Sequence, residues 1–115
     1  MNDLRRAQRK SISGVMLVEN SLNGASLGRI GNLSSTGLML IAPRRLRENA
    51  LYQVRFDLPG ADGRAHAVEI GVHEQWTSAA VTPGQFWIGL RIIDIGNAEQ
   101  ALLDAWVRQP EYAAR

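Results

Sequence analysis

The middle of the chain reads Tyr52-Gln53-Val54-Arg55-Phe56-Asp57-Leu58, and apolar and polar side chains alternate along it without a break. Successive side chains of a β-strand point to opposite faces of the sheet. The period of two therefore predicts a strand whose even-numbered residues face a core and whose odd-numbered residues face water. Turn-forming residues follow at 59–63, and more strand-like sequence lies on both sides.

Five further strands are indicated by apolar runs or by alternation between turn-forming residues. They cover residues 12–18, 25–33, 37–42, 68–73 and 86–92. The first two are joined by Ser21-Leu22-Asn23-Gly24, whose Asn-Gly pair predicts a type I′ hairpin turn with positive φ at both positions. About six short strands joined by tight turns are typical of a small antiparallel barrel or sandwich.

The C-terminal part of the chain has a helical period instead. Asn97, with Gln100 three residues later, is the expected N-cap and capping-box pair, and Pro110 should end the helix. We expect one amphipathic helix at about 97–108. The side chains expected to pack it on the barrel are those of Ala98, Ala101, Leu102, Ala105 and Trp106.

The length of 115 residues suits a single domain with one core. We expect a flexible basic arm at 1–10, a domain at 11–109 and a tail at 110–115. The chain has no cysteine, and its two histidines lie in one strand-like stretch, which argues against a disulfide framework and a structural zinc site. A charged N-terminus and the lack of a long apolar run predict a cytoplasmic protein without a membrane segment.

Sequence patterns typical of enzymes are missing. Ser34 has Asn32 and Thr36 where a G-x-S-x-G nucleophile elbow requires glycines, and no Walker or Rossmann glycine loop occurs. The carboxylates fall mostly on strand positions that face water or in turns. We therefore expect a binding protein with no catalytic residue, no metal and no cofactor.

Two polar motifs lie one hairpin apart: Arg5-Arg6-Ala7-Gln8-Arg9 and Asn32-Leu33-Ser34-Ser35-Thr36-Gly37. Guanidinium groups pair bidentately with phosphate, lie flat on bases and donate to the O6 and N7 edge of guanine. Asn32 and Ser34 offer an amide and a hydroxyl, and Gly37 permits a turn or a close ligand approach. Alone, the first motif is more typical of a solvated tail or nonspecific nucleic-acid arm, and the second of a polar turn. Together they fit the binding of an anion that carries a purine.

The pair resembles the R-x-x-x-R and [D/N]-x-S-x-x-G signature of the PilZ family, which binds the bacterial second messenger cyclic di-GMP. The resemblance covers nearly the whole chain and implies a mainly β fold, a six-stranded antiparallel barrel with a flanking helix. It further implies a monomeric sensor whose arm closes over the ligand and signals to an effector protein in motility or biofilm control. The ligand-binding residues that it implies are Arg5, Arg6, Arg9, Asn32, Ser34 and Gly37.

Lys10, Ser35 and Trp76 are further candidate contacts. Many PilZ domains place an apolar or aromatic residue near Trp76, where it can contact a guanine. The even position of Trp76 matches Val68 and Ile70, however, and this parity favours a barrel-core residue unless the strand bulges. PilZ domains with an arginine before the first motif arginine tend to bind two ligands. Leu4 holds that position here, which favours one ligand per chain. If Arg6 and Lys10 are the motif pair, Arg5 holds the position instead, so the stoichiometry stays open.

Two other functions compete with the sensor. A degenerate PilZ adaptor would bind only protein, but the arginines of the first motif are intact. A small nucleic-acid-binding barrel would use the basic arm for phosphates. No ribonucleoprotein-type aromatic pair occurs on any expected strand, so nucleic acid is not the expected partner.

Overall fold

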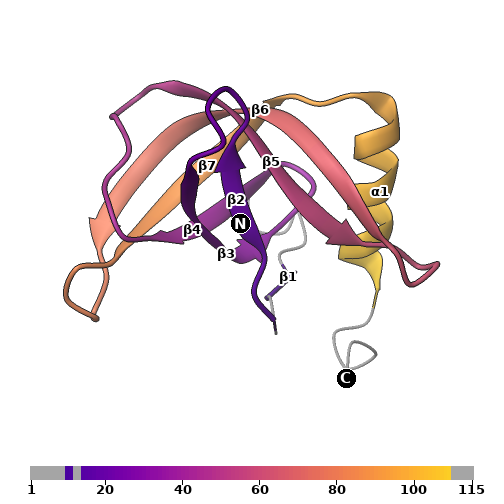
Figure 1. Ribbon diagram of the computed structural model, residues 1–115, viewed down its shortest axis with the longest axis horizontal. Coiled ribbons are helices and arrows are strands. Elements are labelled where there is room, and N and C mark those ends of the chain that lie inside the picture. The colour runs from indigo at the N-terminus through magenta and orange to yellow at the C-terminus, as the bar shows by residue number, and fades with distance from the viewer. Residues whose placement is uncertain (1–9, 12–13, 110–115) are drawn as a thin grey trace, which may run out of the picture.

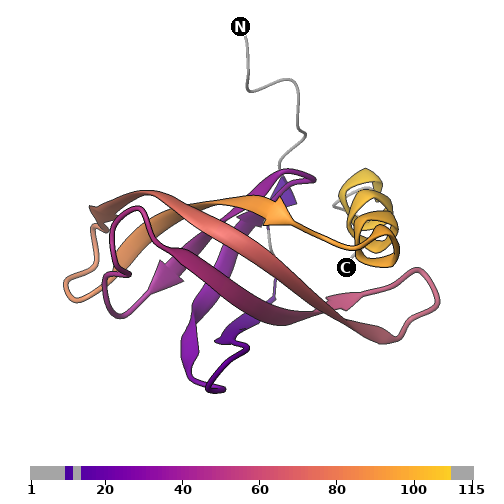
Figure 2. The same cartoon turned by 90° about the horizontal axis from the view of Figure 1, so that it is seen from above.

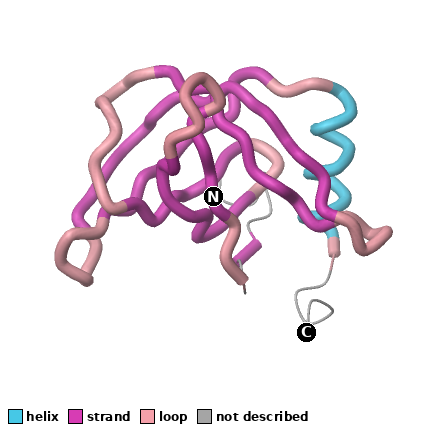
Figure 3. Tube along the Cα trace, viewed as in Figure 1, coloured by secondary structure: helices cyan, strands magenta, loops and turns pink. Residues whose placement is uncertain are grey.

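A computed structural model describes residues 10–11 and 14–109 of the chain. Figure 3 distinguishes the strands, the loops and the single helix of this described part. In chain order the elements are β1 (Lys10–Ser11), β2 (Leu17–Asn20), β3 (Ser26–Leu33), β4 (Gly37–Ala42), β5 (Leu51–Pro59), β6 (Ala65–Ala79), β7 (Phe86–Asp94) and α1 (Asn97–Arg108). None of the helices in the described residues is long and apolar enough to cross a bilayer.

The strands β2 to β7 close into an antiparallel barrel (Figure 1). Neighbours pair in the order β3-β2-β5-β6-β7-β4, and β4 pairs again with β3. The two-residue strand β1 pairs with β3 beyond the point where β2 stops, on the edge of β3 that β4 does not use. The expected six-stranded antiparallel barrel with one C-terminal helix is confirmed.

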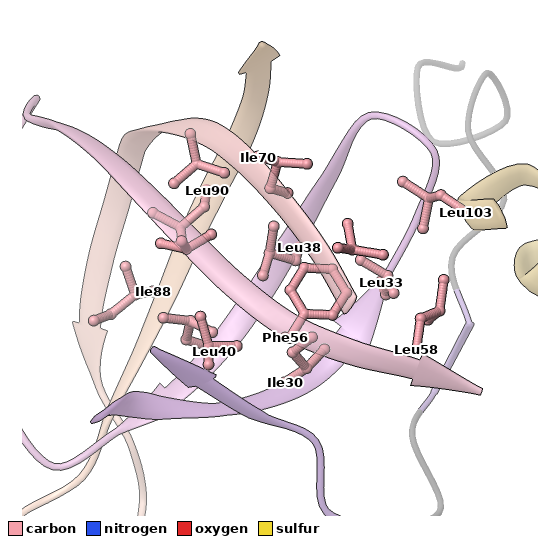
Figure 4. Close-up of a cluster of buried hydrophobic side chains, with 14 of the residues drawn as sticks. Ile30, Leu33, Leu38, Leu40, Phe56, Leu58, Ile70, Ile88, Leu90 and Leu103 are labelled. Carbon is pink, nitrogen blue, oxygen red and sulfur yellow. The ribbon is translucent and has the colours of Figure 1, made fainter. Parts of the chain in front are cut away.

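The barrel interior follows from the alternation along β5. Val54, Phe56 and Leu58 are buried, whereas Arg55 and Asp57 between them are exposed. Burial of such apolar side chains is the main force that holds the barrel closed, at about 25 cal/mol per Å² removed from water. Figure 4 shows Phe56 and Leu58 among buried side chains of the other strands, with Leu103 of α1 near Leu58. The core includes Ile30, Leu33, Leu38, Leu40, Val54, Phe56, Leu58, Val68, Ile70, Val72, Ile88, Leu90 and Leu103.

The helix α1 lies at one end of the barrel (Figures 1 and 2). Its bounds coincide with the expected range, but two details of the sequence-based expectation were wrong. The N-cap is Gly96, with no side-chain cap bond, and the Gln100 side chain donates to Asp104 Oδ1 (3.0 Å). The three alanines of the expected face are exposed, because rotation of the helix buries the larger side chains of Leu103, Trp106 and Val107. Pro110 lies outside the described residues.

The turn between β2 and β3 also differs from the expectation. Asn20 N–H donates to Ala25 O (2.8 Å) and Gly24 N–H donates to Asn20 O (2.8 Å), so four residues form the loop. Gly24 has a φ of 74°, but Asn23 has a negative φ. The hairpin was correctly predicted, and its type I′ turn was wrong, because the Asn23 side chain instead accepts the N–H of Ala25 (2.9 Å) and stabilises a longer loop.

Strand lengths differ from the expectation at two places. The strand expected at 12–18 begins only at Leu17, as β2, because the described residues 14–16 are not in a strand, although Met16 O still accepts the N–H of Ile30 (2.9 Å). Residues 12–13 lie outside the described residues. The strand expected at 68–73 is part of β6, which has 15 residues and contains both histidines. The long β6 extends past the barrel core, and its second half forms one side of the candidate site.

Candidate ligand-binding site

The Asn32–Gly37 segment connects β3 to β4 through a tight turn built around Ser34. Ser34 N–H donates to Gly37 O (2.8 Å), and Ser34 Oγ accepts the N–H groups of Thr36 (3.2 Å) and Gly37 (3.1 Å). Only 1% of Ser34 is exposed. The hydroxyl therefore stabilises the turn, which is a structural role that the sequence pattern did not reveal, and its contact with a ligand stays a prediction. Ser35 lies half-buried in the same turn.

Gly37 is the first residue of β4 and lies opposite Arg91 of β7. A Cβ on Gly37 would lie 2.6 Å from the carbonyl oxygen of Leu90, which is closer than real Cβ contacts. Glycine at this position therefore lets β4 approach β7 and close the barrel. The close approach of a ligand to Gly37 stays a prediction.

Asn32 lies near the end of β3, next to a bulge that shifts the pairing with β4 between Ile30 and Asn32. Its side chain is half-buried, and its Nδ2 lies 3.8 Å from Met39 Sδ on the neighbouring strand. On the other edge of β3, Asn32 pairs with Ser11, and Leu33 pairs with Lys10. Residues 10 and 11 are thus joined by backbone pairing to the second motif.

The expectations for Arg5, Arg6 and Arg9 fall outside the described residues. Lys10 was expected in the arm, and its backbone belongs to β1. Arg9 directly precedes Lys10 in the sequence, and Lys10 pairs with Leu33 of the second motif. The residues of β1, which directly follow the arginine motif in the sequence, therefore pair with the second motif along one edge of β3.

Trp76 is not in the barrel core, so the parity-based expectation for it was wrong. The indole is 47% exposed, because a bulge between Glu74 and Trp76 shifts the pairing of β6 with β7 and reverses the alternation. The ring lies on Gly89 of β7, where a Cβ would collide with it. Trp76 thus presents an indole on the outer face of the barrel.

A buried carboxylate holds this bulge. Glu74 is 4% exposed, and it accepts the N–H of Asn49 at Oε1 (2.8 Å) and the hydroxyl of Thr77 at Oε2 (2.7 Å). Its own N–H donates to Ala50 O (3.0 Å). A buried charge is stable only when it is hydrogen-bonded, and these contacts fulfil that condition. Glu74 has the same even parity as Val68 and Ile70, so its burial agrees with the alternation, although a carboxylate is not expected at such a position from the sequence.

A second chain of hydrogen bonds runs along the same strand. Gln75 Nε2 lies 2.8 Å from His73 Nδ1, and His73 Nε2 lies 2.6 Å from Asn49 Oδ1. In this arrangement the Gln75 amide faces Nδ1 of His73, and the Asn49 amide oxygen faces Nε2. The bonds fix Gln75 beside Trp76 and hold Asn49, whose φ is 58°, against the barrel.

A cleft of about 230 Å³ opens between β4, β6 and β7, next to the turn that Ser34 stabilises. Two of the sequence-predicted residues, Gly37 and Trp76, line it. Sequence reasoning missed the others that matter here, which are Thr36, Met39, Gln75 and Arg91. Arg91 has the polar position in the alternation of β7, but only the strand register brings it next to Gly37.

A larger cavity of about 530 Å³ lies elsewhere, at the seam between β2 and β5. These strands pair only through Glu19 with Arg55 and Asn20 with Val54, and the gap opens beyond that point. Arg55 donates to Glu19 Oε1 (2.6 Å), and this hydrogen bond raises the pKa of the guanidinium. Within the described part of the chain, no motif residue lines the seam, so we take the smaller cleft as the candidate site.

Comparison with protein families gives a match to the family described as PilZ domain over residues 3–109. The chain belongs to the PilZ family. The match covers the arginine motif as well as the barrel and the helix. Comparison with curated proteins gave no match.

Two solved structures share the PilZ fold of this chain. The Bacillus subtilis inhibitor of motility (MotI/DgrA) superimposes with a TM-score of 0.70 at 14% identity, over 90% of this chain and 49% of the Bacillus protein. This PilZ domain thus spans about half the length of that protein. The PilZ domain of YcgR from Escherichia coli, solved with c-di-GMP, gives a TM-score of 0.68 at 16% identity over 96% and 94% of the two chains.

The exposed position of Trp76 leads to a stability prediction. Trp76→Ala should lower the free energy of unfolding by less than about 1 kcal/mol, because surface changes rarely cost more. Trp106→Ala is the matched control: Trp106 is 7% exposed, and truncation of a buried tryptophan costs about 3–5 kcal/mol. Urea unfolding of both variants measures the difference, and equal losses would mean that Trp76 packs in the core.

Proposed function

We propose that this PilZ domain is a cyclic di-GMP sensor that acts by binding and catalyses no reaction. The observation that carries the proposal is the pairing of Lys10 and Ser11, which directly follow the arginine motif in the sequence, with Leu33 and Asn32 of the second motif. Family membership and the fold shared with the YcgR domain support the choice of ligand.

In this proposal the arginines Arg5, Arg6 and Arg9 bind phosphates and guanine edges of the ligand. The Asn32 side chain and the turn around Ser34 and Gly37 form the wall of the site, and Lys10 adds positive charge. Trp76 offers its exposed indole to a base, as aromatic rings in nucleotide sites do. Charge-assisted hydrogen bonds of about 1.5–3 kcal/mol each are sufficient to order a short arm.

The signal is the ordering of residues 1–9 over the barrel face that carries Asn32. Cyclic di-GMP shifts the population toward the closed arm by its differential affinity for that state. The closed arm and the ligand then form a surface that a downstream effector protein recognises. The stoichiometry of one or two ligands per chain is an outcome of the binding experiment.

Calorimetry of the full chain tests the proposal with cyclic di-GMP, GTP and a short single-stranded RNA. We expect cyclic di-GMP to bind at low micromolar affinity or better, near −8 kcal/mol, with much weaker binding of GTP and RNA. Heat from the RNA alone would support a nucleic-acid-binding barrel. No heat from any of the three, with the protein folded, would favour an adaptor that binds only protein.

A further inference from the structure

Arg91 is a cation in the candidate cleft that neither sequence motif contains. In the register of the sheet it lies between Gly37 of β4 and His73 of β6. The residue opposite it on β4 has no side chain, and both ring nitrogens of His73 are hydrogen-bonded to other residues. The Arg91 side chain is exposed and lines the cleft together with Trp76.

The Arg91 guanidinium has no hydrogen bond or ion pair with another described residue. Arg55 on β5 gives the contrast, because its guanidinium is bound to Glu19 at 2.6 Å. The carboxylate nearest in sequence to the cleft, Glu74, is buried and bonded to Asn49 and Thr77. Arg91 is therefore the cationic side chain of the described cleft that is available to a ligand.

The position of Arg91 relative to Trp76 limits what it can contact. The indole lies on Gly89, and Arg91 follows two residues later on the same strand, about 7 Å away along it. A base stacked on the indole would turn one edge toward the guanidinium. Arginine pairs bidentately with the O6 and N7 atoms of guanine, which is its commonest specific contact with a base.

We propose that Arg91 is a specificity-determining residue that reads the O6 and N7 edge of a guanine stacked on Trp76. The inference rests on the proposed function and deepens it by assigning base recognition to β7. The basic residues of the arm then bind mainly the phosphates. Adenine carries an amino group at the position of O6, so Arg91 excludes the adenine analogue of the ligand.

A cycle of protein and ligand variants tests this assignment by calorimetry. The ligands are cyclic di-GMP and its 7-deaza analogue, which lacks N7 but keeps both phosphates. We expect the unaltered protein to lose about tenfold in affinity when N7 is removed. Arg91→Ala should lose about tenfold for cyclic di-GMP and then bind the two ligands equally, because the group that detects N7 is gone.

Two further variants complete the design. Arg91→Lys keeps the charge but not the planar fork, so it should recover less than half of the lost binding free energy. Arg29→Ala is the matched control, because Arg29 is an exposed arginine on β3 that does not line the cleft. It should change the affinity by less than about twofold. Thermal melts verify that each variant is folded.

The outcomes separate this inference from the proposed function. If the unaltered protein binds cyclic di-GMP but Arg91→Ala binds it equally well, the assignment of Arg91 is overturned alone. The same holds if Arg91→Ala loses affinity for both ligands by the same factor, since that result means a phosphate contact. If the unaltered protein binds neither ligand, the proposed function is overturned, and the assignment with it.

Discussion

Deletion of residues 1–9 should abolish the binding of cyclic di-GMP while the barrel stays folded. The deletion removes Arg5, Arg6 and Arg9, whose charge-assisted hydrogen bonds contribute about 1.5–3 kcal/mol each. A micromolar site corresponds to a binding free energy of roughly −8 kcal/mol. Loss of several such bonds removes a large part of it and leaves an affinity too weak to detect at ordinary concentrations. The buried core begins with Val18 in β2, so the deletion removes none of its described side chains.

Single substitutions in the arm test the same role of the arginines in binding without shortening the chain. Arg5→Ala and Arg9→Ala should each weaken binding at least about tenfold, the equivalent of ~1.4 kcal/mol. Arg108→Ala, at the exposed end of α1, is the control for loss of one positive charge. Calorimetry measures the affinities, and circular dichroism the melting temperatures. A shortened chain that binds as well as the full one, or a melting temperature several degrees lower in either arm variant, would contradict the role of the arm.

Glu74→Ala should lower the free energy of unfolding by about 2–4 kcal/mol, which is a large effect for one polar residue. The substitution leaves the N–H of Asn49 and the hydroxyl of Thr77 without their acceptor. It also removes the bond that holds the bulge, so Trp76 loses its fixed position on Gly89. Affinity for cyclic di-GMP should therefore fall together with stability.

Urea unfolding of Glu74→Ala is best compared with that of Glu69→Ala. Glu69 lies on the same strand with an exposed side chain, and its bond to Gln53 is long at 3.4 Å. Loss of this surface carboxylate should cost less than about 0.5 kcal/mol. Equal losses in the two variants would show that the buried carboxylate does not stabilise the bulge.

Alternation predicted the strands because most of this fold has regular strands with one buried face. The expected ranges match β4 as described and lie within β5, and the inward positions Val54, Phe56 and Leu58 are buried. The rule failed at Trp76, since parity assumes an unbroken strand. Glu74, at the bulge, accepts a hydrogen bond from the N–H of Asn49, 25 positions away in the sequence. The pattern of residues along one strand carries no signal of such a contact.

The candidate site was predictable only where a known motif marked it. The Asn32–Gly37 segment was found from its residues, and Trp76 was weighed as a contact, but Arg91 and Gln75 were missed. Their side chains join the cleft through the register of β6 and β7 with β4, which alternation along one strand does not determine. The role of Ser34 in the turn was missed for a related reason. A sequence motif names a residue that contacts the ligand, but it does not show which hydrogen bonds that residue makes within the protein.

Amide NMR of the full chain titrated with cyclic di-GMP is the direct test of binding at the cleft beside the Asn32–Gly37 segment. We expect saturable amide shifts for residues 32–37, 75–76 and 89–91, and a shift of the Trp76 indole N–H. The indole N–H of buried Trp106 should not shift. No shifts at a ligand concentration of about 100 μM, where a micromolar site is nearly full, would contradict binding at this cleft. Shifts confined to the seam near Val15 and Asp57 would contradict it equally.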